Sequence, residues 1–169
     1  MPSNPVGPVN FSAPWGRQLK MLSGLSCAIM IGVSAALAIM APQNPPALYQ
    51  ASIWICPAII LLCVLFAVRG YRVQGDSLLV LRPGWHTRIA LADLISVNHQ
   101  ADATKGSIRL FGNGGFFSFT GLFSNHTLGR YRAFATDFAN TVVLEFPDRK
   151  IVVTPDDPQR FAGLLRPQA

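Results

Sequence analysis

The sequence predicts a membrane α-helical hairpin followed by an α+β, mainly-β domain of about seven antiparallel strands closed by a C-terminal helix. Two long apolar stretches without a charged side chain, at residues 21–41 and 48–68, indicate the hairpin. Short β-rich runs separated by Gly and Pro turns follow residue 70 and indicate the domain. All eight acidic side chains lie beyond residue 68, so charge divides the chain at the same point. We therefore expect a tail over residues 1–18, the hairpin over 19–69 and the domain over 70–169.

The N-terminal tail is rich in proline and glycine and has no charged side chain before Arg17. A segment of this composition buries too little apolar surface to offset its ordering entropy. We therefore expect residues 1–18 to be disordered. Trp15, beside Arg17 and Lys20, is expected to lie at the level of the lipid headgroups.

Each apolar stretch is long enough to cross a bilayer as a helix. At about 1.5 Å per residue, residues 21–41 span roughly 31 Å, close to the roughly 30 Å of a hydrocarbon core. Prolines between residues 42 and 46 end the first helix and leave room only for a tight hairpin. Small residues recur every fourth position of the first span, where they let another helix, most readily the second span, approach closely: Gly24, Ala28, Gly32 and Ala36.

Positive charges orient the hairpin. Arg17 and Lys20 precede the first span, Arg69 and Arg72 follow the second, and the connecting loop has no charge. The positive-inside rule then places both termini in the cytoplasm. The sequence Ala-Leu-Ala at 36–38 also resembles a signal-peptide cleavage site, but the apolar run is long for a signal peptide and a second span follows it.

The domain reads as strands and turns that end in a capped helix. Pro83 and Gly84 suit a type II turn between strands at 77–81 and 86–91. In the last helix, Asp157 is expected as the N-cap and Pro158 suits the first turn. Its apolar face consists of Phe161, Leu164 and Leu165. The remaining strands are expected at 95–99, 107–111, 129–136, 141–146 and 150–154.

Three stretches carry a family resemblance: LADLISV at 91–97, FGNGGFF at 111–117, and the hairpin and helix of 129–165. Together with the order of elements, they resemble bacterial members of the pleckstrin-homology (PH) superfold over about residues 69–169. Bacterial PH-like domains often follow one or two membrane spans, so the resemblance implies the bacterial cytoplasmic membrane. Phosphoinositide binding by eukaryotic PH domains needs a basic cluster in the first hairpin loop. This chain offers there only Arg82, His86 and Arg88.

Chemical motifs for catalysis or for a bound cofactor are absent from the sequence. The three cysteines lie in the apolar stretches, and the three histidines have no ligand spacing. The glycines at 112–115 lack the Lys-Ser/Thr of a phosphate loop. We expect no enzyme activity, no cofactor and no metal. Nucleic-acid binding is disfavoured, because acidic side chains share the domain with the basic ones.

Candidate contact residues come from one aromatic run and one strand. Phe116, Phe117, Phe119 and Phe123, with Leu122, are too many for one face of a short strand. Some of them therefore enter the core, and whether the others form an exposed contact patch or pack in the core as well stays open. Arg130 and Arg132 would add attraction to anionic lipid, about 1 kcal/mol each near the surface. Scattered, solvated bases are the alternative for these two.

These observations predict a membrane-tethered, non-enzymatic PH-like module for binding or scaffolding at the cytoplasmic face. Its expected partners are membrane lipids and a protein, or a second copy of itself. The alternative is a homo-oligomeric structural membrane protein, which the small-residue face of the first span would serve. An enzyme with an unrecognised site is the third reading.

Overall fold

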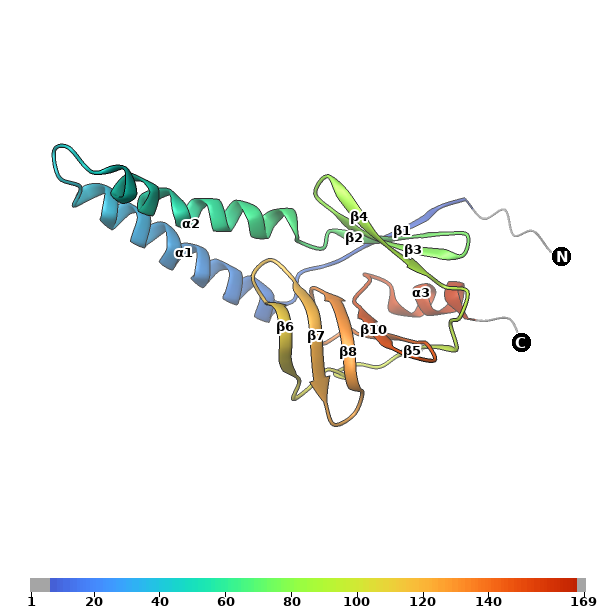
Figure 1. Cartoon of the computed structure of the whole chain (residues 1–169). Coiled ribbons are helices and arrows are strands. Elements are labelled where there is room, and N and C mark those ends of the chain that lie inside the picture. Colours follow the sequence, from blue (N-terminus) through green and yellow to red (C-terminus); the bar gives the residue numbers. More distant parts are fainter. Residues whose placement is uncertain (1–6, 167–169) are drawn as a thin grey trace.

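The computed structural model describes residues 7–166, in which a helical hairpin projects from one end of a β-rich domain (Figure 1). The hairpin consists of α1 (Arg17–Ile39) and α2 (Ala47–Leu65). Both helices are long and apolar enough to cross a membrane. A core helix of a soluble protein would be largely buried, yet α1 has only three buried residues and α2 has none. Side chains such as Leu25 and Leu61 are more than 60% exposed, and so much exposed apolar surface is unsuited to water.

The two helices pack through a face of α1 that the small-residue pattern did not identify. Gly24, Ala28, Gly32 and Ala36 are all exposed, so the expected contact of this face with the second span is wrong. Four residues of α1 that are buried or half-buried are spaced alternately by three and four positions: Cys27, Met30, Ser34 and Leu37. This spacing is typical of helices that pack nearly antiparallel. This face mixes small and large side chains and does not repeat every four residues. A search for small residues at every fourth position therefore does not find it.

Two sheets form the domain. The first has the order β1 (Val9–Ser12), β2 (Gly70–Gln74), β3 (Ser77–Arg82) and β4 (Trp85–Ala90). The second has the order β5 (Ser96–His99), β9 (Val142–Glu145), β10 (Lys150–Val153), β8 (Gly129–Ala135), β7 (Phe119–Asn125) and β6 (Ile108–Gly114). Neighbouring strands are antiparallel except β8 and β10, which are parallel. The fold class expected from the sequence is confirmed.

Three of the ten strands in residues 7–166 go beyond the sequence prediction: β1, β2 and β7. In addition, β6 continues through the glycines of 112–114, where the sequence suggested a break. Gly112 lies opposite Gly121 of β7, and a Cβ on either residue would collide with the backbone of the other strand. The glycines therefore allow close pairing of β6 with β7 rather than ending the strand.

The N-terminal strap, residues 9–16, is ordered, so the expectation of a disordered tail is wrong for this part. Phe11 is 4% exposed and packs edge-on against Phe161, with 5.1 Å between ring centroids. The Gly16 N–H donates to the Thr136 carbonyl at 3.0 Å. Burial of this aromatic side chain and pairing of β1 with β2 offset the ordering entropy that the composition alone could not offset. Residues 1–6 lie outside the described part of the chain.

The second sheet is covered on both faces. One face packs against the first sheet and α3 (Pro158–Leu165). Asp157 caps α3 as predicted, since its carboxylate accepts a hydrogen bond from the Arg160 N–H at 3.0 Å. The other face packs against Leu19 of α1 and Phe138. Between the sheets, the Tyr71 hydroxyl donates to the Phe134 carbonyl at 2.5 Å and accepts from the Thr154 N–H at 3.0 Å. Burial raises the pKa of Tyr71 to about 12.

Candidate binding site where the helices meet the domain

The first turns of α1 belong to the domain as much as to the hairpin. Leu19 is fully buried in the core cluster that contains Phe119. The Ser23 hydroxyl donates to the Gly115 carbonyl at 3.2 Å and accepts from the Phe117 N–H at 2.9 Å. Phe117 has a φ of 64°, a left-handed conformation that is uncommon for a large residue and that this contact helps to hold. The loop at 115–117 is therefore fixed against the start of the first apolar helix.

The end of α2 is fixed to the first sheet. The Trp85 indole N–H donates to the Leu65 carbonyl at 3.0 Å, and the Arg82 guanidinium donates to the Phe66 carbonyl. These bonds satisfy carbonyls that the end of the helix leaves without a partner. Val68, which follows shortly after, is 1% exposed and lies in the core between the sheets. The domain is thus attached to both ends of the hairpin by packing and hydrogen bonds.

A groove of about 560 Å³ opens beside the end of α2, and we call it the arginine groove. It lies between the β3–β4 hairpin of one sheet and strands β6 to β8 of the other. Its lining combines two guanidinium groups with apolar and glycine residues: Phe66, Arg82, Trp85, Thr87, Phe111, Gly112, Thr120, Gly121, Leu122, Arg132 and Phe134. Gly121, with a φ of 143°, leaves part of the wall without side chains.

Arg82 is the most constrained charge of the arginine groove. Its side chain lies between two aromatic rings, with the guanidinium carbon 4.8 Å from the centre of Trp85 and 5.7 Å from that of Phe134. The residue is 7% exposed, and its Nε has no hydrogen-bond partner among residues 7–166. Burial, and next the charge of Arg132, lower the pKa of Arg82.

No carboxylate compensates this pair of arginines within the described residues. The salt bridges that the structure describes there are Arg149–Asp148 and Lys150–Glu145, and neither residue pair lines the groove. The Arg132 guanidinium carbon lies 5.2 Å from the ring centre of Phe134, so the two cations flank one aromatic ring. The groove is therefore electropositive, partly apolar and able to receive an anion.

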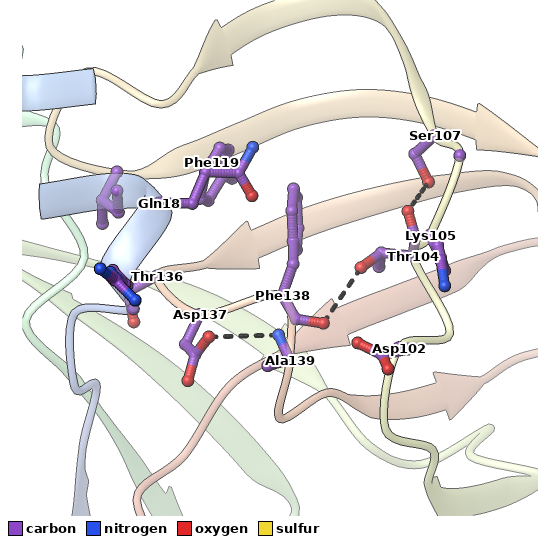
Figure 2. Close-up of a pocket in the computed structure, with 14 residues that line it drawn as sticks. Gln18, Asp102, Thr104, Lys105, Ser107, Phe119, Thr136, Asp137, Phe138 and Ala139 are labelled. Carbon is purple, nitrogen blue, oxygen red and sulfur yellow. Dashed lines mark hydrogen bonds between the residues drawn. The ribbon is translucent and has the colours of Figure 1, made fainter. Parts of the chain in front are cut away.

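A second cavity, of about 470 Å³, lies at the start of α1, and we call it the strap cavity (Figure 2). Several of its polar groups bond to neighbouring groups, as Figure 2 shows for Thr104 with the Phe138 carbonyl and for Asp137 with the Ala139 N–H. The other carboxylate oxygen of Asp137 accepts from the Asn140 amide at 3.0 Å. These bonds stabilise the loops, and the side chains involved are already partnered.

The phenylalanines proposed from the sequence separate into two groups. Phe119 and Phe123 are 3% and 4% exposed and stack with Phe138 and Tyr131, so the expectation that they contact lipid or a partner is wrong. Strand β7 turns both side chains into the core. Phe116 and Phe117 are half-buried in the loop against α1, where Phe117 lies 5.9 Å from Trp15.

The basic candidates also separate. Arg132 is exposed and lines the arginine groove, whereas Arg130, two residues earlier on β8, is exposed outside it. Sequence reasoning included Leu122 in the apolar run but did not assign Arg82, Trp85 or Phe111 to this site. The edge strand β6 also carries exposed apolar side chains, among them Phe111, which is 79% exposed. Among residues 7–166, no group of three His, Cys, Asp or Glu side chains could hold a metal ion.

Comparison with known proteins agrees with the arrangement of the domain. A family model described as "Bacterial PH domain" matches residues 69–169, more than half of the chain. Neither the curated proteins nor the solved structures yield a match. The resemblance noted in the sequence is confirmed, and the chain belongs to the bacterial PH domain family.

Proposed function

We propose that the chain is a membrane-tethered, non-enzymatic binding module whose hairpin spans the bilayer and holds the PH-like domain at the cytoplasmic surface. There the domain contacts anionic lipid or a protein partner. The observation that carries the proposal is the double attachment of the domain: Ser23 binds the loop at 115–117, and Trp85 binds the end of α2. A domain held in this way keeps one end towards the membrane.

The membrane placement is supported by charge and by the strap. Arg17, Lys20 and Arg69 lie around the helix ends that meet the domain, as the positive-inside rule requires of a cytoplasmic side. Because β1 pairs with β2, the strap and the domain form one body on one side of the bilayer. Trp15 is 36% exposed beside Phe117, which suits an aromatic anchor in the headgroup region.

The proposal is tested by photo-crosslinking in native membranes with the full chain. The full chain is needed because Phe11 and Leu19 are part of the domain core. A benzophenone side chain at Phe111, on β6, is compared with one at Leu164, which is 42% exposed on α3 away from the hairpin (Figure 1). We expect adducts with phospholipid or with one distinct protein from position 111 and far fewer from position 164. Equal, weak capture at both positions would contradict a binding role.

A second candidate function, a homo-oligomeric structural protein, is favoured by one observation. The small-residue face of α1 is exposed in the single chain, and nothing lies within 4 Å of a Cβ placed at Gly24 or Gly32. Oxidation of an Ala28→Cys variant that lacks Cys27, Cys56 and Cys63 tests it in membranes. Dimers from Ala28→Cys but not from a Leu62→Cys control would favour this second function, and monomers from both would contradict it.

A further inference from the structure

The arginine groove contains a charge that the described part of the chain does not neutralise. A buried guanidinium normally has a carboxylate partner or a full set of hydrogen bonds, because burial of an unpaired cation is costly. Arg82 lacks both, and Arg132 adds a second positive charge across the ring of Phe134. Two guanidinium groups that converge from different sheets suit an oxyanion with several acceptor oxygens, such as a phosphate.

The neighbouring surface is apolar, and this limits the source of the phosphate. Phe111 and Leu122 form one side of the groove and are 79% and 39% exposed, while Trp85 on the other side is 43% exposed. Inorganic phosphate or a sugar phosphate would leave these side chains in water. A lipid would place its phosphate on the arginines and its glycerol and upper acyl chains on the apolar wall.

The position of the groove favours the same ligand. Phe66, which lines it, is the residue directly after α2, and its ring packs against Trp85 at 5.4 Å between centroids. The end of a spanning helix lies at the depth of the lipid headgroups. The groove therefore opens where a phospholipid from the same leaflet reaches it without leaving the bilayer.

We infer that the arginine groove is a binding site for the phosphate group of an anionic membrane lipid, held by Arg82 and Arg132 and flanked by Trp85, Phe111 and Leu122. The inference rests on the proposed placement of the domain at the bilayer surface. It adds to that proposal one ligand class and one site.

The test uses Trp85 as a fluorescent reporter in the full chain, purified in detergent, with Trp15 and Trp54 replaced by Phe. Short-chain phosphatidylglycerol, short-chain phosphatidylcholine and inorganic phosphate are titrated separately. We expect a saturable change of Trp85 emission with phosphatidylglycerol and at least about tenfold weaker binding of the other two, because charge-assisted hydrogen bonds and apolar contact are both needed.

Two variants of β8 localise the effect. Arg132→Gln should weaken phosphatidylglycerol binding at least about tenfold, because Arg132 lines the groove. The matched Arg130→Gln should change binding less than about twofold, since Arg130 lies on the same strand but outside the groove. Arg132 is exposed, so its replacement leaves the core intact. Arg82→Lys, which keeps the charge but not the planar fork, should also weaken binding while circular dichroism shows an unchanged fold.

Three results would overturn the inference. Equal losses in Arg130→Gln and Arg132→Gln would mean general attraction without a site. Phosphate binding as tight as lipid binding would make the site a soluble-anion site. No response of Trp85 to any ligand would exclude the groove altogether. None of these results contradicts the proposed function, which fails if cross-linking at position 111 is as weak as at position 164.

Discussion

The arginine groove and the strap cavity are similar in size, about 560 and 470 Å³, and each lies where one helix of the hairpin meets the domain. Their polar groups differ. In the strap cavity, Asp137 and Thr104 bond to neighbouring backbone and side-chain groups. In the arginine groove, the positive charges of Arg82 and Arg132 repel each other, and no carboxylate among the described residues forms a salt bridge with either. Asp137 and Thr104, which the protein satisfies, serve stability, whereas the buried and unpaired charge of Arg82 is available to a ligand.

The largest expected effect is on the strap side. Leu19→Ala should lower the free energy of unfolding by roughly 2–5 kcal/mol, because the side chain is fully buried and leaves a cavity. Leu25→Ala on the same helix is the control, since Leu25 is 63% exposed. Thermal unfolding of the full chain in detergent measures both. A similar loss from both variants would mean that α1 is not attached to the domain through Leu19.

The polar network behind the strap should respond to pH. Because the folded pKa of Tyr71 is about 12 and the ordinary value is 10.0, the folded state retains the phenol proton more tightly. Stability is therefore complete below pH 10 and falls between pH 10 and 12, by about 2–3 kcal/mol at most. Unfolding measured from pH 8 to 12 should show this slope. Tyr71→Phe should lose that part of the slope, and an unchanged slope would contradict the assignment.

A smaller effect is expected from the turn beside the strap cavity. Asp137→Ala removes the acceptor for the backbone N–H of Ala139 and for the Asn140 side chain, and should cost about 1 kcal/mol. Chemical denaturation of the full chain measures the loss. No change, or a gain in stability, would show that the bonds of the strap cavity do not stabilise the fold.

The smallest effect has the opposite sign and belongs to the arginine groove. Arg132→Gln removes a like charge beside Arg82, so in lipid-free detergent it should leave stability unchanged or raise it by up to about 0.5 kcal/mol. The same variant is expected to lose lipid binding. A loss of more than about 1 kcal/mol in the absence of lipid would instead make Arg132 a structural residue of the fold.

Local sequence patterns predicted the helices and most strands of this chain well. They did not predict the contacts between segments that are distant in the sequence. The turn at Pro83 and Gly84 and the cap at Asp157 depend on neighbouring residues, so the sequence is enough to place them. Phe11, by contrast, is ordered because it meets Phe161 at the other end of the chain. Composition alone predicts disorder for that segment, because composition contains no information about a distant packing partner.

The candidate site shows the same limit. Charge alone indicates Arg132 as a contact residue, but its partner Arg82 lies on the other sheet, and the sequence around Arg82 indicates only a turn. The phenylalanine run was ambiguous because Phe119 and Phe123 face the core, whereas Phe116 and Phe117 lie in the loop at α1. The pairing of β7 with β8 and the contact of Ser23 with the loop at 115–117 decide between these environments.

The central claim is that the arginine groove, and not the strap cavity, is the ligand site of this bacterial PH domain. The most direct measurement is the melting temperature of the full chain in detergent with phosphatidylglycerol added, for the wild type, Arg132→Gln and Asp137→Ala. A ligand that binds only the folded state raises the melting temperature. We predict a rise for the wild type and for Asp137→Ala and none for Arg132→Gln. A rise in Arg132→Gln equal to that of the wild type would contradict the claim.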